Sequence, residues 1–312
     1  MNKQEAISIL KEHNQEHVIK RLEALGDDAA KKLISQVAMI DWKVVESIKD
    51  KAEDKGDAKK IEPLAAVEIN DIKKNKEKYT AKGVEAIKNG KVAAVLLAGG
   101  QGTRLGLDKP KGTLNVGVNK DLFLFGQLIH NLMDVVNQTG AWVPLYIMTS
   151  DKNNKDTVEF FEEHNYFGYD KDYVKFFIQS MVPSVDYNGK LYMESTDSLA
   201  MSPNGNGGWF LSLIAAGLDK DMQDKGIEYV NVFAVDNILQ RIADPAFIGA
   251  TILAGAECGS KVVRKCEPAE KVGVMCRVNG HPSIIEYYEM SEELASLRRE
   301  DGELTYGFGV IL

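Results

Sequence analysis

The sequence has few cysteines and no long apolar runs, and both absences restrict the class of protein. Its three cysteines, Cys258, Cys266 and Cys276, follow no Cys-x-x-Cys pattern. We therefore expect buried free thiols and neither a disulfide framework nor a structural zinc site. No apolar run reaches the length that crosses a bilayer, and no apolar segment typical of a signal peptide follows Met1. These absences predict a cytoplasmic protein with no membrane partner.

An excess of positive charge is also missing. The chain carries 38 Lys and Arg against 46 Asp and Glu, which gives a formal net charge of −8 at pH 7. Such a protein has no general basic field that would attract a polyanion, so we expect no nonspecific binding of nucleic acid. The length of 312 residues, 44% of them hydrophobic, is sufficient for a large core and two or three domains.

The most informative stretch that is present runs from residue 92 to residue 113. Residues 92–98 form a continuous apolar run, typical of a strand that is buried on both faces. Gly99, Gly100 and Gly102 follow, and they allow a tight turn with bare N–H groups. Three cations come next, at Arg104, Lys109 and Lys111. Backbone donors followed by cations are what a polyphosphate requires.

Two other glycine loops do not fit this stretch. A P-loop would close with Gly-Lys-Ser/Thr, but Leu107 follows Gly106. A dinucleotide fingerprint would have glycine in place of Leu105, and Pro110 disfavours the helix that would follow. The missing acidic partner also argues against a dinucleotide-dependent oxidoreductase. The remaining alternative is a glycine-rich turn with incidental cations.

Strands and helices alternate after this loop. Residue patterns predict helices over 122–137 and 155–165 and strands over 143–149 and 174–178. This order is typical of a parallel, doubly wound α/β sheet. Sheets of this kind bind ligands beyond the carboxyl ends of their strands.

A second glycine loop, Pro203-Asn-Gly-Asn-Gly-Gly208, precedes a predicted helix over 209–216. Polar side chains and bare backbone before a helix can contact a base, a sugar or a phosphate. Further on, a predicted strand over 228–235 ends at Asp236. A carboxylate there could hold Mg²⁺ beside substrate phosphates, and capping of the following turn is the alternative.

The C-terminal part continues with a helix and an antiparallel extension. Asp244 and Pro245 have the residue types of an N-cap and a first helical position. Strands are predicted over 261–264, 272–278 and 283–288. Within the last of these, Glu286 lies in an apolar stretch, where a buried carboxylate is costly without a partner. A sugar hydroxyl would be such a partner, and a surface-facing strand position is the alternative.

These motifs together resemble a known enzyme family. The segment Leu97-Ala-Gly-Gly-Gln-Gly-Thr-Arg-Leu-Gly-Leu-Asp-Lys-Pro-Lys111 is similar to the signature of the sugar-nucleotide pyrophosphorylases. It looks most like the eukaryotic-type UDP-N-acetylhexosamine pyrophosphorylases and their uridylyltransferase relatives. Further similar segments follow, among them 146–150, 203–208, 235–239 and 261–263.

The resemblance implies a Rossmann-like, doubly wound mixed sheet of the glycosyltransferase-A-like nucleotidyltransferase type. This domain would span residues 91–312, after a helical N-terminal region over residues 1–90. Because family members continue beyond this length, we expect the domain to be truncated at its C-terminus. The implied reaction joins UTP and a sugar 1-phosphate with Mg²⁺ to give a UDP-sugar and pyrophosphate. The sugar phosphate would attack in line, so positioning and charge neutralisation would supply most of the acceleration.

The resemblance also implies roles for individual residues. Arg104 and Lys111 would face the β- and γ-phosphates, and Asp236 would bind Mg²⁺. Six residues would bind the nucleotide: Leu97, Ala98, Gly99, Gly100, Gln179 and Gly205. Four residues would contact the sugar: Asn206, Gly273, Glu286 and Tyr287.

The identity of the sugar stays open. N-acetylhexosamine enzymes of this kind carry Asn-Ala-Gly-Asn where this sequence reads Gly307-Phe-Gly-Val310. Val310 cannot replace the hydrogen bond of an asparagine side chain to the sugar. We expect N-acetylglucosamine 1-phosphate to be the preferred substrate. The alternative is a pyrophosphorylase of the UDP-glucose or UDP-galactose type. A non-catalytic protein that binds nucleotide sugars is a further alternative, and the sequence does not indicate an oligomeric state.

Overall fold

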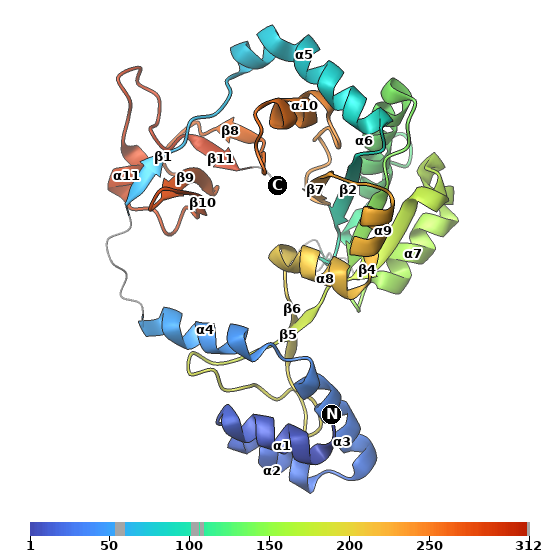
Figure 1. Ribbon diagram of the computed structural model, residues 1–312, viewed down its shortest axis with the longest axis vertical. Helices are drawn as coiled ribbons and strands as arrows, with labels where there is room; N and C mark the ends of the chain where they lie inside the picture. Colours follow the sequence, from blue (N-terminus) through green and yellow to red (C-terminus); the bar gives the residue numbers. More distant parts are fainter. Residues whose placement is uncertain (54–59, 101–105, 107–108, 311–312) are drawn as a thin grey trace. The chain divides into compact units, whose positions relative to one another are not determined.

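The computed structural model describes residues 1–53, 60–100, 106 and 109–310. The chain divides into two compact units (Figure 1). Unit 1 combines Met1–Asp57 with Gln179–Gly208, and unit 2 combines Ala58–Ile178 with Trp209–Leu312. Each unit is therefore built from two stretches of sequence, whereas the sequence analysis expected one boundary near residue 90.

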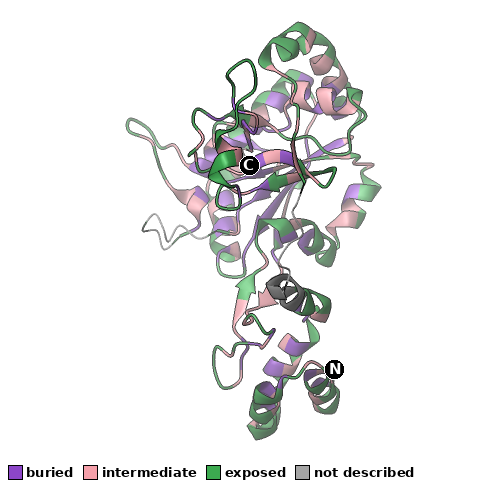
Figure 2. Cartoon of the chain, turned by 90° about the vertical axis from the view of Figure 1, so that its left-hand side faces the viewer, coloured by how far each residue is buried: buried purple, intermediate pink, exposed green. Residues whose placement is uncertain are grey.

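In the described residues, the centre of unit 2 is a four-stranded parallel sheet in the order β4-β3-β2-β7. Its strands are β2 (Val92–Leu97), β3 (Leu145–Thr149), β4 (Val174–Ile178) and β7 (Tyr229–Ala234). Every residue of β2 and β3 is buried, as the purple strands of Figure 2 show. Strands covered on both faces need apolar side chains at every position. The predicted α/β fold with a parallel sheet is confirmed.

Both faces of this sheet are covered by helices. Ala94 and Leu96 of β2 pack in one apolar cluster with α6 (Leu124–Thr139). Their neighbours Ala93 and Val95 belong to a different cluster, which includes Leu213 of α8 (Trp209–Ala215) and Met222 of α9 (Leu218–Asp224). Since successive side chains of a strand point to opposite faces, the two clusters lie on opposite sides of β2.

The strand order brings two loops together at one edge of the sheet. From β2 the chain moves outward to β3 and β4, and then returns to place β7 on the other side of β2. Leu97, the last residue of β2, is paired with Ala234, the last residue of β7. Ligands of open parallel sheets bind at the carboxyl ends of strands where the order reverses. The loops after Leu97 and Ala234 border this position.

Two glycines allow α5 (Ile69–Lys88) and α10 (Pro245–Leu253) to touch along their backbones. A Cβ atom on Gly83 would lie 1.9 Å from the carbonyl oxygen of Pro245. A Cβ atom on Gly249 would lie 1.8 Å from the carbonyl oxygen of Tyr79. This contact fixes α10, which begins directly after the loop that carries Asp236.

The antiparallel extension predicted for the C-terminal part is present in unit 2. In the described residues it is a five-stranded sheet of β1, β8, β9, β10 and β11. These strands are Ile61–Pro63, Val262–Arg264, Val274–Val278, His281–Ile285 and Phe308–Val310. Asn279 and Gly280 turn between β9 and β10 with φ of 52° and 84°. Positive φ at both positions suits a two-residue hairpin turn. The chain then forms α11 (Glu292–Ser296).

Unit 1 contains the N-terminal helices and a long excursion from the middle of the chain. Its helices are α1 (Lys3–Glu12), α2 (Glu16–Ala24), α3 (Asp27–Ala38) and α4 (Trp42–Glu53). Between β5 (Met181–Pro183) and β6 (Met201–Pro203), the excursion adds Leu191 and Leu199 to the apolar core of these helices. The Gln15 amide is 1% exposed, donates to the carbonyl of Gly189 (2.8 Å) and accepts from the N–H of Leu191 (3.0 Å).

The three cysteines are free thiols, as expected, but the expected burial is wrong for two of them. Cys276 is buried in β9, whereas Cys258 and Cys266 are exposed in the segments on either side of β8. In the described residues, no group of three or more His, Cys, Asp or Glu side chains could hold a metal ion. None of the described helices has both the length and the apolar character needed to cross a membrane.

A charged cluster joins α9 to the sheet. The Asp221 carboxylate accepts hydrogen bonds from the Tyr146 hydroxyl (2.6 Å) and from the amino groups of Lys175 and Lys225. Partial burial opposes ionisation of Asp221, but these three donors hold its pKa well below the ordinary value. Burial first, and Asp221 second, raises the pKa of the Tyr146 hydroxyl.

We expect Asp221→Asn to lower the free energy of unfolding at pH 7, because the hydrogen bonds to a charged carboxylate are lost. The loss should be only about 1–2 kcal/mol, since both lysines remain partly in solvent. A carboxyl with a lowered pKa stabilises the fold above its ordinary pKa and loses this effect as the pH falls toward its folded pKa. Urea unfolding should therefore show the two proteins converging below about pH 4. The matched control is Asp224→Asn, at an exposed position of the same helix. An equal loss in this control would contradict the role of the cluster.

Candidate active site

The candidate site begins where β2 leaves the interior. Leu97 and Ala98 are 6% and 2% exposed, Gly99 is half-buried and Gly100 is exposed. The Ala98 N–H still donates to the carbonyl of Met148 at the end of β3 (2.8 Å). The predicted nucleotide-binding backbone therefore starts on the rigid edge of the sheet. Arg104, predicted to contact the phosphates, lies outside the described residues.

A buried asparagine that the sequence analysis missed holds this segment. Asn153 is 2% exposed, and its Nδ2 atom donates to the carbonyl oxygens of Ala98 (3.0 Å) and Gly100 (3.3 Å). An Asn before a predicted helix is an ordinary N-cap pattern. The sequence therefore carries no sign that this side chain binds a loop some fifty positions earlier.

The structure brings Lys111 and Asp236 together as an ion pair. Lys111 begins a short 3₁₀ turn, Lys111–Thr113, and Asp236 follows β7. The Lys111 side chain is 29% exposed and that of Asp236 is 61% exposed. Two residues predicted to contact phosphate and Mg²⁺ thus meet where the strand order reverses. In the described residues, the Asp236 carboxylate forms this pair and no cap of the following turn.

The backbone of the Lys111 turn lies directly on a helix. A Cβ atom on Gly112 would lie 2.3 Å from the ring of Phe125, which is fully buried at the start of α6. The Thr113 hydroxyl donates to the carbonyl of Pro110 (2.8 Å) and closes the turn. Absence of a side chain at position 112 is therefore required for the observed position of Lys111.

The loop that carries Asp236 is held by two asparagines. Asn131 of α6 donates through Nδ2 to the carbonyls of Ile238 (2.8 Å) and Gln240 (3.2 Å). Asn231 of β7 accepts from the N–H of Ala243 (2.7 Å), a residue held at a φ of 50°. Left-handed backbone is unfavourable for alanine, so these contacts fix a strained loop.

Asp244 has the predicted role of helix N-cap. Its Oδ1 atom accepts from the N–H of Ala246 (3.2 Å) at the start of α10. Its Oδ2 atom lies 3.3 Å from the amino group of Lys261, an ion pair that the sequence pattern did not indicate. Asp244 therefore links the end of the Asp236 loop to the start of β8.

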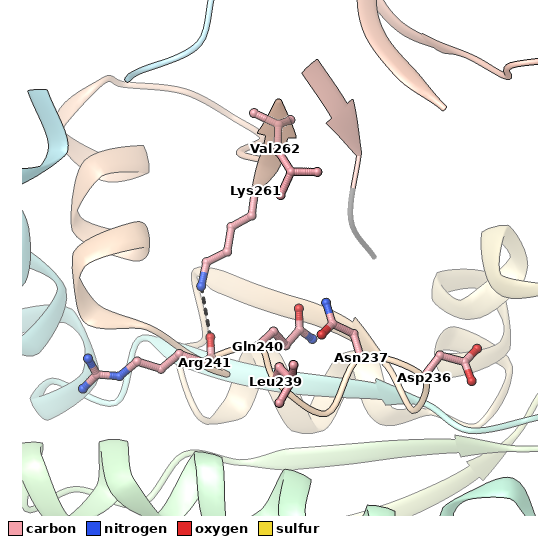
Figure 3. Close-up of a pocket in the computed structure, with 8 residues that line it drawn as sticks. Asp236, Asn237, Leu239, Gln240, Arg241, Lys261 and Val262 are labelled. Atoms are coloured by element: carbon pink, nitrogen blue, oxygen red, sulfur yellow. Dashed lines mark hydrogen bonds between the residues drawn. The ribbon is translucent and has the colours of Figure 1, made fainter. Parts of the chain in front are cut away.

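An open pocket of about 600 Å³ lies beside this loop (Figure 3). Lys261 reaches toward the loop from the start of β8, and its amino group donates to the carbonyl of Arg241 (3.2 Å). The Nε2 atom of Gln240 is buried without a hydrogen-bond partner among the described residues. The pocket is lined by Asp236, Asn237, Leu239, Gln240, Arg241, Lys261, Val262 and Val263. It offers both amide and ammonium donors and an apolar wall.

Two of the predicted sugar contacts meet in the antiparallel sheet. A Cβ atom on Gly273 would lie 3.3 Å from Oε1 of Glu286, so the carboxylate lies over the bare backbone. The carbonyl of Gly273 accepts from the N–H of Val310 (2.9 Å), and Val310 is paired with Val262 of the pocket wall. Tyr287, also predicted, is 45% exposed and packs edge-on against Tyr288 at 5.2 Å.

The other predicted contacts belong to unit 1. Gln179 is 5% exposed at the start of the excursion. Gly205 has a φ of +75°, and Asn206 begins a 3₁₀ turn, Asn206–Gly208. The structure thus groups Lys111, Asp236, Gly273, Glu286 and Tyr287 in one unit and these three residues in the other.

A lysine near Tyr287 was also missed by the sequence analysis. Lys265 is only 7% exposed, and its amino group donates to the carbonyl of Pro268 (3.0 Å). It lines a second, smaller pocket of about 170 Å³ together with Tyr287. A lysine that follows a predicted strand usually faces solvent, so the burial of Lys265 could not be predicted from the residue pattern.

Comparison with known proteins assigns the family. The profile described as UTP–glucose-1-phosphate uridylyltransferase matches residues 31–302. The chain belongs to this uridylyltransferase family. The resemblance drawn from its motifs is therefore confirmed.

Among relatives of the family, "UDP-N-acetylhexosamine pyrophosphorylase-like protein 1" of Homo sapiens is 45% identical over 76% of this chain and 48% of its own length. "UDP-N-acetylglucosamine pyrophosphorylase" of Saccharomyces cerevisiae is 37% identical over 97% of this chain and 64% of its own length. The crystal structure of the uridine diphosphate N-acetylglucosamine pyrophosphorylase from Trypanosoma brucei superposes with a TM-score of 0.84 at 30% identity. The match covers 100% of this chain and 66% of the trypanosomal chain. The chain thus spans about half to two thirds of the length of these relatives.

Gly112→Ala should destabilise this uridylyltransferase-family chain by about 1–3 kcal/mol, because the new methyl group overlaps the Phe125 ring. The measurement is the urea midpoint of Gly112→Ala, of Phe125→Leu and of the double variant. Removal of the ring should relieve the overlap, so the double variant should lose less stability than the sum of the single ones. Strict additivity would show that the close contact does not constrain the turn.

Proposed function

We propose that the chain carries the catalytic machinery of a uridylyltransferase, which joins UTP and a sugar 1-phosphate to give a UDP-sugar and pyrophosphate. The observation that carries this proposal is the pair Lys111–Asp236 beside the glycine loop, where the strand order reverses. Family membership supports it, as do the names of the yeast and trypanosomal relatives.

The finer fold assignment belongs to this proposal. A Rossmann-like, doubly wound sheet of the glycosyltransferase-A-like type is supported by the reversing strand order and by helices on both faces of β2. Residues 91–312 would supply the nucleotidyltransferase domain and residues 1–90 the helical region that precedes it. Of this region, β1 and α5 pack with unit 2. We also propose a cytoplasmic location.

UTP would bind at the end of β2. The backbone of Leu97, Ala98, Gly99 and Gly100 would contact the uracil end, and Gln179 and Gly205 would complete recognition of uridine. Lys111 would face the β- and γ-phosphates, a role that Arg104 would share. Because the pair Lys111–Asp236 remains in contact with solvent, a bound polyphosphate offers the ammonium group an alternative anion at low cost.

Lys111 is the residue proposed to promote the reaction directly. As the bond between the α- and β-phosphates breaks, negative charge develops on the departing pyrophosphate. A lysine held at a fixed position stabilises this charge without reorganisation of water. The protein's other task is to align the sugar phosphate opposite the leaving group, and no covalent intermediate is needed.

The residues present are compatible with Mg²⁺. The Asp236 carboxylate is 61% exposed, so it can accept a ligand beside Lys111. A single carboxylate suits Mg²⁺, which takes its other oxygens from phosphates and water. When bound, this ion would neutralise phosphate charge.

The sugar would lie toward the antiparallel sheet. Gly273, Glu286 and Tyr287 of unit 2 are the proposed contacts, together with Asn206 of unit 1. The pocket beside Asp236 supports a sugar with an N-acetyl group, because it combines the side-chain amide of Asn237 with Val262 and Val263. N-acetylglucosamine 1-phosphate is therefore the proposed substrate. Glucose or galactose 1-phosphate is the second candidate, favoured by Val310 and by the family description.

A pyrophosphate-release assay with UTP, Mg²⁺ and a panel of sugar 1-phosphates tests the function. We expect the largest kcat/KM with N-acetylglucosamine 1-phosphate. A tenfold or larger preference for glucose or galactose 1-phosphate, about 1.4 kcal/mol, would overturn the N-acetyl assignment. UTP binding in calorimetry without turnover of any sugar would favour a non-catalytic binding protein. Absence of both UTP binding and turnover would contradict the proposal.

Lys111→Ala should lower kcat by about 10²–10³, the usual effect of one lost transition-state donor. The matched control is Lys120→Ala, an exposed cation further along the same connection to α6. Thermal unfolding should change little in either variant, since both side chains are outside the core. A kcat near the wild-type value in Lys111→Ala would remove this lysine from the mechanism.

Asp236→Asn keeps the shape of the side chain but removes the charge that would attract Mg²⁺. We expect lower activity and a higher Mg²⁺ concentration for half-maximal rate, measured by Mg²⁺ titration of the assay. Asp244→Ala is the control, because its N-cap role predicts a stability loss of about 1 kcal/mol and an unchanged Mg²⁺ dependence. An unaltered Mg²⁺ curve in Asp236→Asn would refute the metal role of this carboxylate.

A further inference from the structure

Asn153 occupies a helix N-cap position without capping the helix. It precedes α7 (Asn154–Glu163), yet its side chain makes no capping hydrogen bond. An asparagine at this position ordinarily accepts from an N–H of the first turn, which contributes about 1 kcal/mol. The side chain of Asn153 is 2% exposed and is directed instead to other backbone groups.

Those groups belong to two strand ends. The Oδ1 atom accepts from the N–H of Ser150 after β3 (2.7 Å), and Nδ2 donates to the carbonyls of Ala98 (3.0 Å) and Gly100 (3.3 Å). The partners fix the orientation of the Asn153 amide. Only its oxygen can accept a hydrogen bond from an N–H, and only its nitrogen can donate to a carbonyl. One buried amide therefore ties the start of the glycine loop to the end of β3.

These bonds determine which backbone groups remain for a ligand. The carbonyl of Ala98 shares its peptide plane with the N–H of Gly99, so the bond to Asn153 fixes that plane, and the bond to the carbonyl of Gly100 holds the backbone on the other side of Gly100. The N–H groups of Gly99 and Gly100 donate to no described residue. Gly100 is exposed, and a Cβ atom there would meet nothing within 4 Å. Donors of this kind, on a backbone that Asn153 holds, can receive an acceptor atom of a ligand.

We propose that Asn153 is a positioning residue for nucleotide binding, which orients the backbone of Gly99 and Gly100 toward the uracil end of UTP. This inference rests on the proposed function, since UTP is the ligand concerned. Preorganised donors bind without loss of loop entropy, so their effect appears in affinity and base selectivity. Phosphate contacts from Lys111 are independent of this amide.

The test compares Asn153→Asp with Asn154→Ala in the intact chain. Asn153→Asp keeps the shape and the acceptor for Ser150 but turns a donor into an oxygen that faces two carbonyls. Asn154 is the next residue and accepts from the Thr149 hydroxyl (2.7 Å), whose oxygen also lies 3.1 Å from the carbonyl oxygen of Phe177. Asn154→Ala thus perturbs the same strand end without touching the glycine loop.

Calorimetry measures the dissociation constants of UTP, UDP and CTP, and thermal unfolding is recorded for each variant. We expect Asn153→Asp to weaken the binding of UTP and of UDP by the same factor. The factor should be about tenfold or more, because two buried hydrogen bonds are lost. Its preference for UTP over CTP should fall as well. Asn154→Ala should retain wild-type affinity and base preference.

Several outcomes overturn the inference. Unchanged UTP affinity in Asn153→Asp, or equal weakening in Asn154→Ala, would show that Asn153 has only a structural role. A loss of affinity for UTP without a loss of affinity for UDP would locate the effect at the γ-phosphate instead of the uracil end. If Asn153→Asp does not fold, Asn153→Ala gives the same comparison without the repulsion. Failure of the wild-type chain to bind UTP would instead contradict the proposed function.

Discussion

Burial of β2 on both faces is the constraint from which the candidate site follows. Its six residues, Val92–Leu97, contribute side chains to two separate apolar clusters. A strand in this position cannot carry polar side chains, so chemistry can begin only beyond its carboxyl end. Because β7 ends at the same level on one side, the loops after both strands reach the same edge of the sheet. The positions of Gly99, Gly100, Lys111 and Asp236 depend on this arrangement.

Asparagines hold the loops at that edge, where apolar packing ends. Asn153 binds the carbonyls of Ala98 and Gly100, Asn131 binds those of Ile238 and Gln240, and Asn231 binds the N–H of Ala243. Backbone groups beyond a strand end have lost their ladder partners, and a buried amide can satisfy two of them at once. In the loop after β7 these bonds act together with core side chains such as Val235 and Ile242, and the backbone conformation of the loop is defined by both.

The charged side chains of the site form ion pairs in which a ligand can replace one partner. Lys111 and Asp236 neutralise each other across the edge of the sheet, and Lys261 is shared between Asp244 and the carbonyl of Arg241. Pairs in contact with solvent contribute little to stability, so a ligand with charges of its own can replace them. The cluster around Asp221 differs, because its carboxylate is only 18% exposed and accepts from Tyr146 of β3 and Lys175 of β4, away from the loops.

The sequence alone determined the strands of the parallel sheet, the glycine loop and the helix start at Asp244, since each depends on residues close together in the chain. It also determined the family, because the motif Leu97–Lys111 is local. Tertiary structure decided which residues meet: Asn153 with Gly100, Lys111 with Asp236, and Gln15 with Leu191. These contacts join distant segments, and polar residues such as Asn153 and Gln15 have the same local pattern whether they cap a helix, face solvent or hold a loop. Their roles are set by the partners that folding brings to them.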